Sequence, residues 1–179
     1  MPEIARPKRR KPLVVHLGNV GFDGQAIAYK TRKRAQRFPN ATFIGVDLIN
    51  PGDHRPPNWH QFHGDFESGL KRLKDNSASA ISSEFALGYY GPEGEEEQPI
   101  LDHMEYTLRV VNLAHKKLKP GGKMLLVVDE ADAEFFEWLL RQSAFGGKFA
   151  ARQLFPQEYS RTPSIFVHER GACQITAEK

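Results

Sequence analysis

Leu13-Val-Val-His-Leu-Gly-Asn-Val-Gly-Phe-Asp-Gly24 joins a short apolar run to a loop with a glycine at every third position. The apolar run, residues 13–17, is rich in valine and stops at Gly18, which predicts a buried strand. Over residues 24–38, small and apolar side chains recur at helical spacing, and basic residues occupy the rest of the helix surface. The stretch therefore predicts a strand, a glycine-rich turn and a helix in succession.

The same alternation of strand-like and helix-like segments continues along the chain. We expect further strands at residues 41–48, 59–63, 78–87, 123–128, 149–155 and 164–168. We expect further helices at residues 66–74, 99–119 and 133–145. A short loop between the last two strands favours an antiparallel pair. Strands that alternate with helices predict an α/β fold with a doubly wound, mostly parallel sheet covered on both faces.

Length and composition fit a globular protein. The 179 residues suffice for one domain with a sizeable core, and we expect a flexible basic leader over residues 1–11 and a single domain over residues 12–179. The single cysteine, Cys173, excludes an intramolecular disulfide and favours a reducing, cytoplasmic compartment; we expect it beyond the last strand. No apolar run approaches the roughly 20 residues that span a bilayer, so we expect no membrane partner.

Charge is distributed unevenly along the chain. Residues 1–37 carry ten Lys or Arg and two acids, a balance of +8, whereas the remaining residues have a balance of −5. Such polarity is a weak indication of nucleic acid, which the cluster from Arg6 to Lys11 could contact, although a solvated tail explains that cluster equally well. The five bases between Lys30 and Arg37 fall in the last turns of the first helix, where they meet the negative end of its dipole. We therefore expect them to lie away from the substrate.

Ligands of an open parallel sheet bind outside the carboxyl ends of its strands, so the loops there are the candidate site. The glycines from Gly18 onward allow close approach to a ligand, although a tight strand-to-helix turn requires glycines in any case. Asp47 ends the second strand, where an acid can accept hydrogen bonds from both hydroxyls of a ribose; by itself it is equally well explained as a solvated carboxylate. Asp65 can accept a hydrogen bond from an adenine amine, cap the helix that starts at Phe66, or do both.

Four segments together resemble the class I S-adenosylmethionine-dependent methyltransferases, over about residues 12–170. They are Val14-Val-His-Leu-Gly18, Ile44-Gly-Val-Asp47, Gly64-Asp-Phe66 and Leu118-Lys-Pro-Gly-Gly-Lys-Met-Leu-Leu-Val-Val128, of which the last is the most specific. The resemblance implies a Rossmann-like, seven-stranded sheet with an antiparallel last strand. Two features depart from the family: His16 stands where an acid is usual, and the glycines are three residues apart rather than two.

The resemblance also implies S-adenosylmethionine as the cofactor. Residues implied to bind it are Gly18, Asn19 and Gly21 (methionine part and ribose), Asp47 (ribose hydroxyls), Leu48 (adenine), Asp65 and Phe66 (adenine amine and ring), and Ser83 (opening towards the acceptor). Glu84 and Tyr89 are the catalytic candidates after the fourth strand; Tyr89 can stack on a flat acceptor or serve as a half-buried loop anchor. We name no metal ligands.

The predicted function is methyl transfer from S-adenosylmethionine to a nitrogen or oxygen atom of an acceptor. The sequence leaves open whether that acceptor is a small molecule, RNA or protein. A non-catalytic binding protein with the methyltransferase fold is one alternative, indicated by His16 and the irregular glycines. A nicotinamide dinucleotide oxidoreductase is a weaker alternative, because the chain lacks a separate substrate domain and an evident Tyr-x-x-x-Lys pair.

Overall fold

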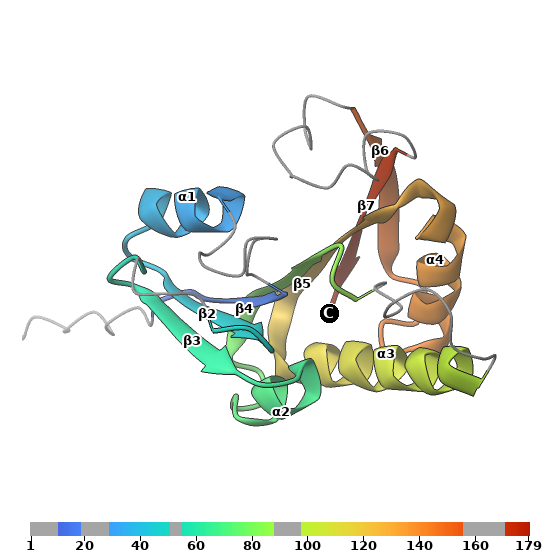
Figure 1. The fold of residues 1–179 in the computed structure, drawn as a ribbon, viewed down its shortest axis with the longest axis horizontal. Helices are drawn as coiled ribbons and strands as arrows, with labels where there is room; N and C mark the ends of the chain where they lie inside the picture. Colours follow the sequence, from blue (N-terminus) through green and yellow to red (C-terminus); the bar gives the residue numbers. More distant parts are fainter. Residues whose placement is uncertain (1–10, 19–28, 51–54, 88–97, 156–170) are drawn as a thin grey trace, which may run out of the picture.

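The computed structural model describes residues 11–18, 29–50, 55–87, 98–155 and 171–179, and its strands form one seven-stranded sheet (Figure 1). The strands are β1 (Leu13–Leu17), β2 (Thr42–Asp47), β3 (Trp59–His63), β4 (Ala78–Glu84), β5 (Leu118–Asp129), β6 (Phe149–Leu154) and β7 (Ala172–Glu178). The helices are α1 (Tyr29–Arg37), α2 (Phe66–Lys71), α3 (Gln98–Lys117) and α4 (Ala133–Gln142), with a short 3-10 helix, η1 (Glu130–Asp132), before α4.

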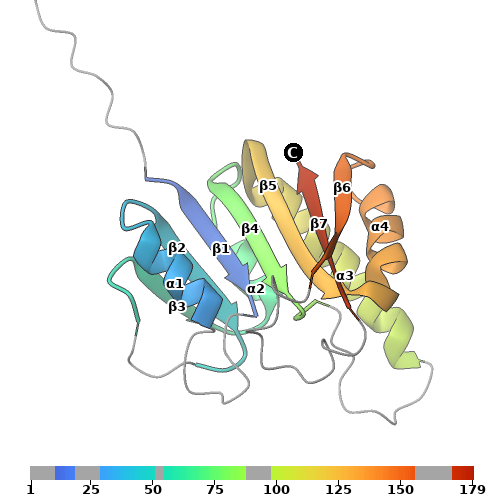
Figure 2. The ribbon, with the colours of Figure 1, turned by 90° about the horizontal axis from the view of Figure 1, so that it is seen from above.

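The sheet has the strand order β3-β2-β1-β4-β5-β7-β6. β1 to β5 pair in parallel, whereas β7 is inserted antiparallel between β5 and β6. Figure 2 shows β1, β4 and β5 ending at one side of the sheet, here called the carboxyl edge, while β7 runs the opposite way. The predicted α/β fold, with a mostly parallel sheet and an antiparallel last strand, is thus confirmed.

Helices cover the two faces of the sheet unequally. Within the described residues α1 lies on one face, and α2, α3 and α4 lie on the other (Figure 1). The larger core is between the sheet and α2 to α4, where side chains such as Ile81, Leu126 and Ile175 are fully buried. A smaller core under α1 contains Ala35 and Phe43. Burial of these apolar side chains stabilises both layers, at roughly 25 cal/mol for each Å² removed from water.

Several predicted boundaries shift by a few residues. β4 ends at Glu84 rather than at residue 87, because Phe85 has a left-handed backbone with φ +57°. β5 begins at Leu118 rather than at residue 123, because Leu118 already pairs with Ala78 ahead of an irregularity in the β4–β5 pairing. α2 and α4 are each three residues shorter than predicted, and α3 ends at Lys117. Of the predicted first helix, residues 29–38 are among the described residues, and the helix ends at Arg37, one residue earlier than predicted.

The last strand is where the sequence prediction was wrong. The predicted strand 164–168 lies outside the described residues, and the strand that pairs with β6 is β7, so residues 155–171 separate them rather than a short loop. Cys173 therefore lies in the last strand and not beyond it. In β7, buried Cys173, Ile175 and Ala177 alternate with less buried neighbours, a period of two that indicates a strand but is weak when carried by alanine and cysteine.

Within the residues that the structure describes, none of the helices is both long enough and apolar enough to cross a bilayer.

Candidate functional site

Gly18 turns the chain at the carboxyl end of β1. Its backbone is left-handed, with φ +71°, and its amide donates a hydrogen bond to the carbonyl of Val46, at 2.9 Å. A Cβ atom at this position would lie 2.1 Å from Cβ of Ala86 and 3.6 Å from Cζ of Phe66. Glycine is required here both for the backbone conformation and for the close approach of the segment after β4. The turn thus brings three loops of the carboxyl edge into contact.

Asp47 ends β2 beside the end of β3. One of its carboxylate oxygens accepts a hydrogen bond from the amide of Ile49, at 3.0 Å, and Asp47 pairs in register with His63. His63 Nε2 donates to the carbonyl of Leu48. The Leu48 side chain is 69% exposed, which leaves an apolar surface open next to the Asp47 carboxylate. The pair can offer a carboxylate and an apolar contact to the same ligand.

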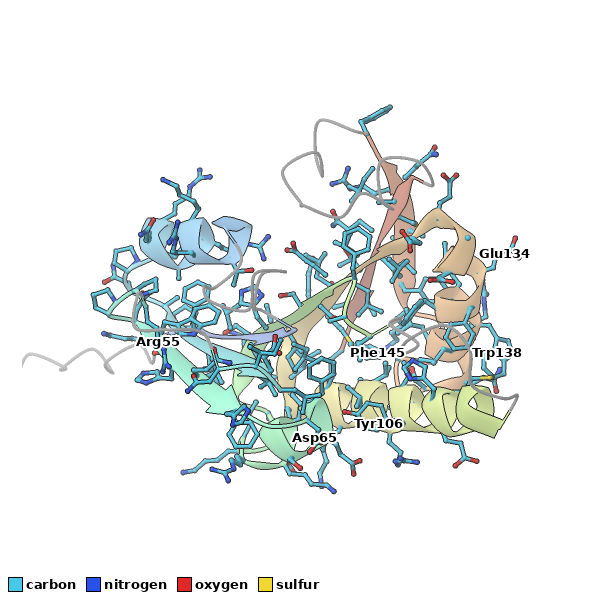
Figure 3. All side chains as sticks on the ribbon, in the orientation of Figure 1. Arg55, Asp65, Tyr106, Glu134, Trp138 and Phe145 are labelled. Atoms are coloured by element: carbon cyan, nitrogen blue, oxygen red, sulfur yellow. The ribbon has the colours of Figure 1, made fainter. Side chains whose placement is uncertain are left out.

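Asp65 and Phe66 open α2 on the other side of Gly18. Asp65 is the N-cap of α2 and accepts a hydrogen bond from the amide of Ser68 at 2.8 Å. Hydrogen bonds from the Ser68 hydroxyl and, to a smaller extent, from its amide lower the pKa of the Asp65 carboxyl. The capping role that the sequence left open is therefore present. The hydroxyl of Tyr106, on α3, accepts a hydrogen bond from the Phe66 amide at 3.2 Å and fixes the start of α2 (Figure 3). Burial raises the pKa of Tyr106.

The end of β4 carries Ser83 and Glu84. Ser83 is buried, and its hydroxyl has no hydrogen-bond partner among the described residues. Glu84 forms an ion pair with Arg34 of α1, with 3.6 Å between the guanidinium nitrogen and the carboxylate oxygen. The bases of the first helix were expected to lie away from the substrate because that helix end points away from the carboxyl ends of the strands, and this reason does not hold for Arg34, whose long side chain reaches Glu84 there.

His16 lies buried beneath α1, with its Nδ1 hydrogen-bonded to the hydroxyl of Ser82. Its ring stacks on Phe43 and Trp59, with centroids 6.0 and 5.8 Å away. Burial, with a smaller contribution from the positive charge of Arg34, lowers the pKa of His16 to about 3. Where the resembling family usually has a carboxylate, this chain therefore has a neutral imidazole whose Nε2 has no partner among the described residues.

Two residues at the edge escaped the sequence analysis, Arg34 and Asp129. Asp129 ends β5 on the same sheet face as Glu84, because Val127 pairs with Glu84 and strand side chains alternate. Its Oδ1 is buried without a partner in the described part of the chain. A carboxylate directly after the predicted fifth strand was the available signal for Asp129. Nothing in the pattern of α1 singles out Arg34 among its basic neighbours.

The structure thus brings together most of the described candidates. Gly18 bonds Val46, the residue before Asp47, and lies close to Phe66, and Ser83 and Glu84 follow on the adjacent strand β4. Asn19, Gly21 and Tyr89 lie outside the described residues.

Comparison with protein-family models finds no match, and comparison with curated protein sequences finds none either. Solved structures do match. A SAM-dependent methyltransferase from Archaeoglobus fulgidus aligns with a TM-score of 0.62 at 11% identity, over 94% of this chain and 86% of that one. An antibiotic-related methyltransferase aligns with a TM-score of 0.60 at 16% identity, over 94% and 88%. The 16S rRNA methyltransferase KamB aligns with a TM-score of 0.59 at 14% identity, over 93% and 87%.

The sheet itself distinguishes between the families that the sequence left open. A dinucleotide-binding sheet has the order 3-2-1-4-5-6 with parallel strands, whereas here an antiparallel β7 separates β5 from β6. The matching solved structures share this overall fold. At 11–16% sequence identity they establish the fold of this chain and not its activity. The chain has the fold of the class I S-adenosylmethionine-dependent methyltransferases.

Proposed function

We propose that this protein binds S-adenosylmethionine at the carboxyl edge and transfers its methyl group to an acceptor beside β4. The observation that carries the proposal is the position of Gly18 within a methyltransferase fold: its amide bonds Val46, next to Asp47, and its Cα side lies close to Phe66. Among the structural neighbours is a 16S rRNA (adenine(1408)-N(1))-methyltransferase with SAM as cosubstrate, aligned with a TM-score of 0.55 at 13% identity. That protein supports the choice of cofactor without assigning an acceptor.

The described residues fit an adenosyl group chemically. The Asp47 carboxylate can accept hydrogen bonds from two ribose hydroxyls, and the exposed Leu48 side chain offers an apolar surface for adenine. Asp65 keeps acceptor capacity beyond its bond to the Ser68 amide, which suits an exocyclic amine. The buried, unpartnered hydroxyl of Ser83 is a polar group that a ligand can satisfy. We assign Asn19 and Gly21 to the same site by their place after β1.

The chain's own contribution to methyl transfer is positioning. Bound S-adenosylmethionine supplies an electrophilic methyl group on a sulfonium. The residues around β4 must hold the acceptor in line and exclude water, a contribution that reaches roughly 7–11 kcal/mol in favourable cases. We propose that Glu84, held by Arg34, accepts a hydrogen bond from the acceptor, and that Tyr89 lines the acceptor side. A base is needed only where the acceptor must lose a proton before attack.

The proposal treats residues 12–179 as one methyltransferase domain preceded by the basic segment 1–11. Its acceptor is a nitrogen or oxygen nucleophile. Three of the structural neighbours are described as 16S rRNA methyltransferases and a fourth as an aminoglycoside resistance methyltransferase, so RNA is one of the acceptors to test.

Isothermal titration calorimetry with S-adenosylhomocysteine tests the proposal. We expect saturable binding of one ligand per chain, because the product analogue shares the adenosyl and homocysteine groups of the cofactor. Reduced nicotinamide dinucleotide, titrated in parallel, should not bind. The proposal is refuted if the protein is folded, as verified by circular dichroism, and does not bind S-adenosylhomocysteine at millimolar concentration. Tight binding of the dinucleotide would favour the oxidoreductase instead.

His16 supports a second candidate, a protein that binds the cofactor without turnover. The neutral imidazole removes the charge that the resembling family usually places near the cofactor's methionine part. Incubation with methyl-labelled S-adenosylmethionine and pools of RNA, protein or metabolites separates the two. Label that enters any pool, and that fails to enter with a Glu84→Ala variant, supports the enzyme. Cofactor binding without label in any of the pools supports the non-catalytic protein.

A further inference from the structure

All the charged residues of helix α1 are basic. Its nine residues, Tyr29–Arg37, include five Lys or Arg and no Asp or Glu. Lys33 and Arg37 stand four residues apart, a spacing that places both on the same side of the helix. With a rise of about 1.5 Å per residue, they are about 6 Å apart along the helix axis. Arg32, directly before Lys33, is partly exposed beside them.

The basic side of α1 faces away from the sheet. Thr31 and Ala35 are buried against the sheet, whereas Lys33 and Arg37 are exposed. Figure 3 shows nitrogen-tipped side chains on the side of α1 that points away from the strands. Because the small residues face inward, α1 presents no apolar stripe that could insert into a membrane. Its outer surface is suited to a soluble polyanion.

The helices on the opposite side of the sheet carry acids as well as bases. There the described ion pairs join the bases of α2, α3 and α4 to nearby acids on the same or adjoining segments. Lys71, Arg109 and Lys116, for example, are each within 4 Å of an Asp or Glu. The concentration of positive charge on α1 is therefore a property of one face and not of the whole surface.

Helix α1 also reaches the carboxyl edge. Arg34, on the flank of the basic face, contacts Glu84 there, with 3.6 Å between the guanidinium nitrogen and the carboxylate oxygen. The basic face therefore lies next to the place where the acceptor is proposed to bind.

Phe38 adds an aromatic surface to this face. Its side chain is 52% exposed, directly after α1, and the guanidinium of Arg37 lies 5.8 Å from the ring centroid. An exposed aromatic ring among cations is the combination that binds single-stranded nucleic acid, because unpaired bases stack on the ring while phosphates meet the charges. A phosphorylated peptide would use the charges but has no bases to stack on the ring.

We propose that α1 and Phe38 bind the backbone and bases of single-stranded nucleic acid, and that this strand is the methyl acceptor. The second half rests on the proposed function, since methylation of the strand requires the cofactor to be bound beside Glu84. RNA and DNA share the phosphodiester chemistry that the surface recognises.

Fluorescence anisotropy tests the surface with labelled single-stranded RNA, the same DNA sequence, and vesicles containing phosphatidylserine. The main variant is Arg32→Ala/Lys33→Ala/Arg37→Ala, which leaves Arg34 and Glu84 intact and keeps helix-forming residues in α1. The matched control is Lys71→Ala/Arg109→Ala/Lys116→Ala, which removes the same charge from the opposite side. Phe38→Ala tests the stacking surface separately.

We expect the α1 triple variant to bind nucleic acid about tenfold or more weakly than the wild type. The slope of log affinity against log salt concentration should fall in magnitude by about two. The control variant should stay within about twofold of the wild type, and Phe38→Ala should weaken binding at unchanged salt slope. Preference for RNA or for DNA identifies which nucleic acid carries the acceptor. The proposal is overturned by absence of binding to both strands, by equal losses in the two triple variants, or by binding to vesicles alone.

Titration of each variant with S-adenosylhomocysteine separates this inference from the proposed function. Nucleic-acid binding without cofactor binding would refute the methyltransferase proposal and leave the surface standing. Cofactor binding without nucleic-acid binding would refute the surface and leave the methyltransferase.

Discussion

Asp47 is the side chain on which the proposed cofactor site depends most. Its carboxylate stands at the end of β2 with one oxygen bonded to the Ile49 amide. Hydrogen bonds to a charged group contribute about 1.5–3 kcal/mol, so we expect Asp47→Ala to weaken binding of S-adenosylhomocysteine by about 10- to 100-fold in calorimetry. Glu105→Ala, which removes a 77% exposed carboxylate from α3, is the control and should bind like the wild type. Equal affinity of all three proteins would remove Asp47 from the site.

His16 makes the stability of the protein sensitive to pH. In the folded state its pKa falls to about 3 from the ordinary 6.5, because burial and Arg34 disfavour the charged ring. The unfolded chain therefore binds a proton below pH 6.5 that the folded chain excludes, so stability is lost as the pH falls through the range between these values. The slope approaches about 1.4 kcal/mol per pH unit, which amounts to about 2 kcal/mol between about pH 7 and about pH 5.

Urea unfolding at several pH values measures that slope. We expect His16→Phe, which preserves stacking on Phe43 and Trp59, to flatten the dependence above pH 5, whatever its effect on absolute stability. His60→Asn, at an exposed position of β3, should leave the slope as in the wild type. A His16→Phe protein with an unchanged slope would show that the buried ring does not control it.

Helix α2 is held close to the sheet by a glycine. A Cβ atom on Gly69 would lie 2.5 Å from Cγ1 of Val46 and 2.9 Å from Cδ1 of Phe62. We therefore expect Gly69→Ala to lower the free energy of unfolding by about 1–3 kcal/mol in urea titration, despite the better helix propensity of alanine. Lys74→Ala, at an exposed position just after α2, should change stability little. If Gly69→Ala proved as stable as Lys74→Ala, the close packing of α2 would be wrong.

Elements with a strong periodic pattern were predictable, and those that depend on pairing were not. The third strand, residues 59–63, agrees with β3 throughout, and the second strand and third helix agree within one or two residues at each end. β5 was predicted five residues too short at its start, because Lys119-Pro-Gly-Gly122 has turn-forming residues, yet tertiary pairing keeps the segment extended. β7 was missed because small side chains carry its alternation.

Over the whole molecule, the sequence predicted the positions of the candidate residues in the fold better than it predicted which other residues they contact. The edge position of Asp47, Asp65 and Glu84 follows from the ends of parallel strands, which the alternation of elements indicates. The contacts of Tyr106 with Phe66 and of Arg34 with Glu84 join residues 40 and 50 positions apart. Such contacts depend on how helices pack across the sheet, for which local periodicity carries no signal.

The fold shows where part of the basic charge of the sequence lies on the molecule. From the sequence, the excess of basic residues in the first 37 positions indicated nucleic acid only weakly. In the folded molecule the part of that excess on α1 occupies one face, opposite the ion-paired helices and next to the carboxyl edge. Part of the charge excess counted in the sequence thus forms a surface next to the proposed acceptor site.

A crystal structure of the protein grown with S-adenosylhomocysteine would test the central claim most directly. We expect the ribose hydroxyls within hydrogen-bond distance of the Asp47 carboxylate, with the adenine beside Leu48 and Phe66 and its amine facing Asp65. The sulfur should point towards Ser83 and Glu84, where the acceptor is proposed to enter. A nucleoside bound elsewhere on the molecule, with the carboxyl edge empty, would contradict the account.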